Sequence, residues 1–134
     1  VRDSDLYRCA ASIAGISDLS LLESEARYFA SSLIAMNQIG SDSAKLKADS
    51  PRRHVEDVHI PVLMIHGDLD AQANVEQSEA MDKALTKAGK PHEFLLVPGA
   101  DHQMSRESDR TTLLSALEKF LAKNLGPGVS APPQ

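Results

Sequence analysis

The chain is poor in aromatic residues and in cysteine. It has no tryptophan, and aromatic residues make up 4% of its 134 positions, so its core must be built mainly from aliphatic side chains and methionine. The single cysteine, Cys9, excludes a disulfide within the chain. We expect it to be a small buried residue inside a strand. The compartment stays open, with the cytoplasm slightly favoured.

The sequence also lacks features that membrane and nucleic-acid partners would require. No apolar run approaches the roughly 20 residues of a membrane-spanning helix, and no signal peptide is visible. The net charge is −5 and the 14 basic residues form no long run, so we expect neither nucleic acid nor a membrane as partner. Hydrophobic residues make up 42% and charged residues 25%, which is typical of one globular domain.

The most informative stretch runs from Pro61 to Asp70. Its apolar residues 62–65 predict a strand that is buried on both faces, as in a parallel sheet. His66-Gly67-Asp68 then turns the chain, and Asp70 follows. Open α/β sheets carry their chemistry just beyond the carboxyl ends of such strands. We therefore expect Asp70 to lie at a functional edge.

A histidine follows at the spacing of one strand–helix–strand unit. Pro98-Gly-Ala-Asp-His102 comes 32 residues after Asp70, and such a unit takes about 30 residues. The two side chains should therefore emerge side by side at the same sheet edge. An aspartate that orients a histidine forms two thirds of a hydrolase triad.

The remaining segments complete an α/β pattern of three parallel strands with helices on both faces. One long helix with a single inward face is expected over 19–36, and Gln77 should form a capping box with Asn74. Leu113, Leu114 and Phe120 should point inward from the last helix. The other expected elements are strands over 9–14 and 92–97, helices over 43–48 and about 74–88, a last helix beginning between 105 and 109 and ending at Gly126, and a disordered tail over 127–134.

These motifs together resemble the C-terminal part of the catalytic domain in the prolyl oligopeptidase family of serine peptidases, which includes acylaminoacyl and dipeptidyl peptidases. The resemblance covers about residues 7–126. It is carried by Ala14-Gly15 with Asp18, Ser50-Pro51 with His54-Val55, 60–70, 75–81, 84–90 and 98–102. It departs from the family at 71–74, where apolar residues and a proline are more usual.

The resemblance implies an α/β-hydrolase fold, a short peptide substrate and no cofactor. Asp70 would be the triad acid and His102 the base. The nucleophile would be a serine in a Gly-x-Ser-x-Gly turn, yet no two of the seven glycines are four positions apart. We therefore expect residues 1–126 to be a partial peptidase domain without its nucleophile, cut at its N-terminus and inactive by itself. A carboxylesterase of the same fold is the alternative.

Several other interpretations of the same residues are open. Ser17, in Gly15-Ile-Ser-Asp, is a weak candidate nucleophile because the second glycine is missing. His66 is expected to support its turn through a ring hydrogen bond, and Asp68 to form the turn. The remaining histidines, His54, His59 and His92, are expected at the surface.

Two functions of another class compete with hydrolysis. His66, Asp68, Asp70, Asp101 and His102 could bind a divalent metal ion, although the glycine turn disfavours His66 and Asp70 pointing together. Alternatively, the chain is a non-catalytic, self-associating unit. The strand over 9–14 would leave an edge unpaired, and bare edges recruit partners, so a homodimer through that edge is expected.

Overall fold

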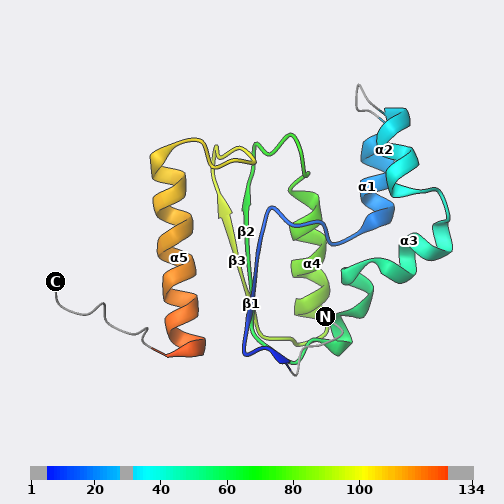
Figure 1. Cartoon of the computed structure of the whole chain (residues 1–134). Coiled ribbons are helices and arrows are strands. Elements are labelled where there is room, and N and C mark those ends of the chain that lie inside the picture. Colours follow the sequence, from blue (N-terminus) through cyan, green and yellow to red (C-terminus); the bar gives the residue numbers. More distant parts are fainter. Residues whose placement is uncertain (1–5, 28–31, 127–134) are drawn as a thin grey trace.

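A computed structural model describes residues 6–27 and 32–126, and they form an α/β unit (Figure 1). Its helices and strands are, in order, β1 (Ala10–Ile13), α1 (Leu19–Ala26), α2 (Ser32–Ile39), α3 (Ser43–Asp49), the 3₁₀ helix η2 (Pro51–Asp57), β2 (Val62–Gly67), α4 (Glu76–Lys87), β3 (His92–Val97) and α5 (Glu107–Leu125). The predicted tail over 127–134 lies outside the described residues.

The three strands form one parallel sheet in the order β1-β2-β3. Ile65 is in register with Ile13 on one side and with Leu95 on the other. Helix α5 covers one face of the sheet and α4 the other, with α1–α3 beyond α4 (Figure 1). The predicted fold class is confirmed.

The central strand β2 supplies side chains to the core on both sides of the sheet. Leu63 and Ile65 pack with Phe120 of α5, whereas Met64 packs with Met81 and Leu85 of α4. Because neighbouring strand residues point to opposite faces, a continuous apolar run is what a doubly covered strand requires. This burial holds the carboxyl end of β2 in place.

The prediction of one long helix over 19–36 is wrong. The segment forms α1 and α2 as separate helices, and Leu33 and Ile34 of α2 are 87% and 65% exposed. Helical spacing cannot tell a face that meets a sheet from one that lies outside, and α2 lies beside α1 away from the sheet (Figure 1). Residues 28–31 of the expected helix lie outside the described residues.

Smaller corrections concern single residues. Cys9 precedes β1, because the strand begins one residue later than expected. Its side chain is half-buried against the core. Leu114 is 60% exposed, since it lies on the outer side of α5. Helix η2 was not predicted. Among the described residues, no helix is both long enough and apolar enough to cross a membrane.

Candidate active site

The turn after β2 brings two loops into close contact. Gly67 ends β2, and a Cβ atom added there would lie 2.3 Å from the main-chain oxygen of Ala100. Only a glycine allows this approach. Leu69 N–H also donates to Ala100 O (3.1 Å), and Gly99 N–H donates to Asp68 Oδ1 (2.5 Å). Asp68 therefore links the loops after β2 and β3, beyond the turn-forming role predicted for it.

Asp70 and His102 meet across these loops. His102 Nδ1 lies 2.8 Å from Asp70 Oδ2. The Asp70 side chain is fully buried, while that of His102 is 34% exposed. The predicted side-by-side arrangement is confirmed. Because Nδ1 bonds to Asp70, Nε2 is the ring nitrogen left to exchange a proton.

The Asp70 carboxylate is held by hydrogen bonds on both oxygens. Oδ1 accepts from the N–H groups of Gln72 and Ala73, each at 2.8 Å, and Oδ2 faces His102. Burial by itself would raise the pKa of Asp70, but the bonds from Ala73, His102 and Gln72 hold that pKa below its usual value. The charged form is therefore favoured, which suits a group that orients an imidazole.

The loop that carries His102 is fastened by two arginines at the start of α5. Arg106 donates to Pro98 O (2.8 Å) and, through Nε, to the buried carboxylate of Asp109 (2.8 Å). Arg110 donates to Met104 O (3.0 Å), where Met104 has a φ of 50° and is buried. Sequence reasoning missed these residues, because nothing in their spacing indicates which carbonyls they reach.

His66 is buried beside this pair. Its Nε2 lies 2.9 Å from Ala73 O and its Nδ1 lies 2.7 Å from Ser78 Oγ, so the predicted supporting hydrogen bond is confirmed. The expectation that His66 and Asp70 point apart is wrong. His66 Nε2 lies 3.3 Å from Asp70 Oδ2, because the chain curls back after Gly67.

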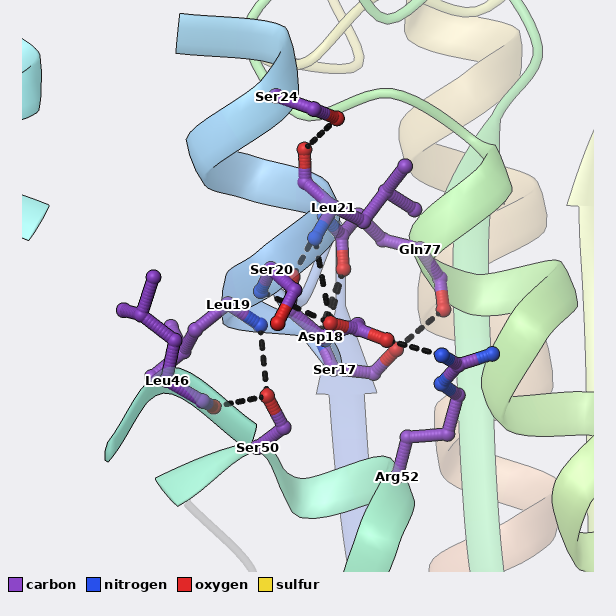
Figure 2. A network of polar contacts seen from close by, with 10 residues as sticks. All are labelled: Ser17, Asp18, Leu19, Ser20, Leu21, Ser24, Leu46, Ser50, Arg52 and Gln77. Atoms are coloured by element: carbon purple, nitrogen blue, oxygen red, sulfur yellow. Dashed lines mark hydrogen bonds and ion pairs between the residues drawn. The ribbon is translucent and has the colours of Figure 1, made fainter. Parts of the chain in front are cut away.

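Ser17 belongs to a different buried network, drawn in Figure 2. Its Oγ donates to Gln77 O (2.5 Å), which commits the hydroxyl proton to a main-chain carbonyl. The side chain of Gln77 accepts from the N–H groups of Ser17 and Asp18. The capping box predicted for Gln77 is therefore wrong, although Asn74 does accept from Glu76 N–H (3.1 Å). A buried tertiary partner has replaced the local one.

The metal hypothesis finds no support in the part of the chain that the structure describes, where no three or more His, Cys, Asp or Glu side chains are placed so that they could hold a metal ion. Asp101 accepts from Ser105 N–H (2.9 Å), away from the pair. Of the histidines expected at the surface, His59 is exposed. His54 and His92 are half-buried because their rings bond to Ala48 O and Lys90 O.

A parallel sheet with an aspartate and a histidine paired beyond neighbouring strand ends is the arrangement of an α/β-hydrolase. Comparison with known proteins gives the particular family. The model of the prolyl oligopeptidase family of peptidases matches residues 1–128, and the chain belongs to this family.

Individual relatives agree with this assignment. An uncharacterized peptidase of Bacillus subtilis, YuxL, is 32% identical over 95 residues, which cover 71% of this chain and 13% of that protein. A puromycin-hydrolyzing peptidase of Mycobacterium tuberculosis superposes with a TM-score of 0.82 at 26% identity, over 96% of this chain and 20% of its own. The acylaminoacyl peptidase of Pyrococcus horikoshii shares the fold, with a TM-score of 0.80 at 20% identity over 98% and 22% of the two chains.

Proposed function

We propose that this chain supplies the acid and the base of a serine peptidase that cleaves short peptides. The observation that carries the proposal is the 2.8 Å contact between His102 Nδ1 and the buried Asp70 carboxylate. His102 Nε2 would take the proton of a serine hydroxyl as that oxygen attacks the peptide carbonyl, and would then pass it to the leaving amine. Asp70 would hold the tautomer in which Nε2 is free to accept.

The nucleophile of this reaction would lie outside the 134 residues. The chain contains no Gly-x-Ser-x-Gly sequence, and it spans about a fifth of the solved relatives that it matches. Backbone N–H groups that stabilise the oxyanion would also come from elsewhere. We infer that the chain by itself is inactive, and that the complete protein needs no cofactor, since the acid, base and nucleophile suffice.

The peptidase proposal is supported by the names of the relatives, which are peptidases. A carboxylesterase is the second candidate, because the same pair can serve ester chemistry. A matched amide and ester with the same acyl group would separate them. The peptidase proposal expects turnover of both substrates by the complete protein, whereas cleavage of the ester alone would favour the esterase.

A fluorophosphonate probe, which labels activated serines, tests the division of the site between this chain and the rest. We expect no mass adduct on the 134-residue chain and one adduct on the complete protein. His102→Ala should abolish the adduct in the complete protein, while His92→Ala should leave it intact. An adduct on the short chain would mean that a serine within it, Ser17 first, is the nucleophile.

We also propose that the short chain self-associates through β1. All four residues of β1 are exposed, and its pairing within the described residues is to β2 alone. An exposed strand edge offers N–H and C=O groups to a second copy. Light scattering after size exclusion should give a dimer whose fraction rises with concentration. A monomer at all concentrations would overturn this proposal without affecting the peptidase one.

A further inference from the structure

A relay of hydrogen bonds runs behind the Asp70–His102 pair from helix α4. It begins at Ser78, in the first turns of α4, and passes through the ring of His66 to the carbonyl of Ala73. Ala73 in turn donates its N–H to Asp70 Oδ1 (2.8 Å). Ala73 is thus bound through its carbonyl by His66 and through its N–H by Asp70.

The partners of His66 define its tautomer. The oxygen of Ala73 can only accept, so Nε2 carries the ring proton. Nδ1 is then an acceptor, and the Ser78 hydroxyl donates to it. The protonated Nε2 also lies 3.3 Å from Asp70 Oδ2, the oxygen that receives His102. Both the ring of His66 and the side chain of Asp70 are fully buried, so this contact is not screened by water.

We propose that His66 is a positioning residue for the acid–base pair, with its ring held between the carbonyl of Ala73 and the hydroxyl of Ser78. It acts in two ways: it fixes the carbonyl of Ala73, the residue whose N–H holds Asp70 Oδ1, and it places a ring N–H near Oδ2. The carboxylate is therefore restrained to one orientation, from which it selects the Nδ1–H tautomer of His102. The catalytic meaning of this role rests on the proposed function, but the restraint itself does not.

The test is the ring ¹H–¹⁵N spectrum of His102 in the 134-residue chain, where ¹⁵N shifts report which nitrogen carries the proton. The unaltered chain should show the Nδ1–H tautomer. His66→Leu removes the relay and should split the population between both tautomers. His66→Gln keeps an N–H close to the position of Nε2 and should restore the single tautomer. His92→Gln is the matched control, because that ring contacts Asp82 (3.1 Å) at the other end of β3.

Each result decides the matter. A folded His66→Leu chain whose His102 keeps the Nδ1–H tautomer overturns the proposal. If His66→Leu does not fold, Ser78→Ala decides, since it removes only the hydroxyl that anchors Nδ1 of the His66 ring. A mixture of His102 tautomers supports the proposal there, and an unchanged spectrum overturns it.

The same variants in the complete protein provide a second readout. His66→Leu should lower kcat by about 10–100-fold with an unchanged KM, because His66 positions the pair and touches no substrate. An effect on KM alone would also count against the proposal. If the unaltered short chain lacks the Nδ1–H tautomer, the proposed function fails first, which keeps the two failures distinguishable.

Discussion

Two loops of this molecule have the same local design and different partners. The loop after β1 contains Gly15-Ile-Ser-Asp18, and β2 ends at the glycine of Gly67-Asp-Leu-Asp70. In each loop, Oδ1 of the aspartate accepts the N–H groups two and three residues onward. In each, Oδ2 pairs with a side chain from a distant segment, and that side chain is about one third exposed.

The identity of the distant partner separates the two loops. Asp18 pairs with Arg52, a group that stays charged, and its Oδ1 caps helix α1. Asp70 pairs with His102, whose ring nitrogens can both donate and accept a proton. The same carboxylate geometry therefore makes a permanent ion pair in one loop and a candidate acid–base pair in the other.

The largest expected effect comes from exchanging the partners. His102→Arg would convert the second loop into a copy of the first, with the ion pair to Asp70 kept and the proton acceptor lost. We expect kcat/KM of the complete protein to fall by about 10⁴-fold. Its melting temperature should change little. Arg52→His is the matched exchange and should leave kcat/KM within a few-fold of the unaltered enzyme. Substantial activity in His102→Arg would remove His102 as the base.

The next largest effect is expected from replacing the glycine of each loop, Gly67 or Gly15, by alanine. Gly67→Ala places a Cβ against the main chain of Ala100, which cannot rotate away, and should destabilise the chain by about 3 kcal/mol. Gly15→Ala meets only the side chain of Ser12, whose hydroxyl is the nearest atom and can rotate away, and should cost less than about 1 kcal/mol. Urea unfolding measures both values. Equal losses would mean that the contact between the Gly67 and Ala100 loops is not tight.

Removing the first aspartate should have a smaller effect on stability and none on the second loop. Asp18→Ala loses a helix cap and leaves Arg52 unpaired, and we expect a loss of about 2 kcal/mol. Asp42→Ala is a suitable control, because Asp42 caps α3 through the same two bonds and is exposed; its loss should be about 1 kcal/mol. The difference isolates the Arg52 pair. A changed His102 spectrum in Asp18→Ala would show that the loops are coupled.

Acid should lower the stability that both loops contribute, and this is the smallest of the expected effects. Burial opposes ionisation of each aspartate, but hydrogen bonds from Leu21 and Ala73 and the partners Arg52 and His102 leave both pKa values lowered. A lowered carboxyl pKa means that the unfolded chain takes up the proton first. The stability contributed by Asp18 and Asp70 is therefore complete above their ordinary value of 3.8 and lost as the pH falls through the folded-state values.

Urea unfolding between pH 6 and pH 2.5 measures this dependence. Circular dichroism is the suitable signal, because the chain has no tryptophan whose fluorescence could be followed. Asp18→Asn should flatten the acid limb, since it keeps a capping oxygen and removes the titrating group. An acid limb that is identical in Asp18→Asn and the unaltered chain would contradict the assignment.

The sequence by itself determined the elements whose signals are local. The apolar run of β2, the strand over 92–97 and the spacing from Asp70 to His102 predicted the sheet and the pair at its edge, because each lies within one strand–helix–strand unit. The His66 ring contact was also predicted, from its place in the turn. These inferences needed no knowledge of which surfaces meet.

Only the tertiary structure decided the rest. Whether Leu33 and Leu114 are buried depends on which helix face meets the sheet. The side chain of Gln77 bonds to Asp18, 59 residues away, and not to the N-terminus of its own helix. The pairing of Asp18 with Arg52 likewise joins residues 34 apart. The spacing of hydrophobic residues predicts that a helix has an apolar face, but packing in the folded chain decides which surface covers that face. The partner of a buried polar group is likewise decided by the free-energy cost of leaving that group without a hydrogen bond.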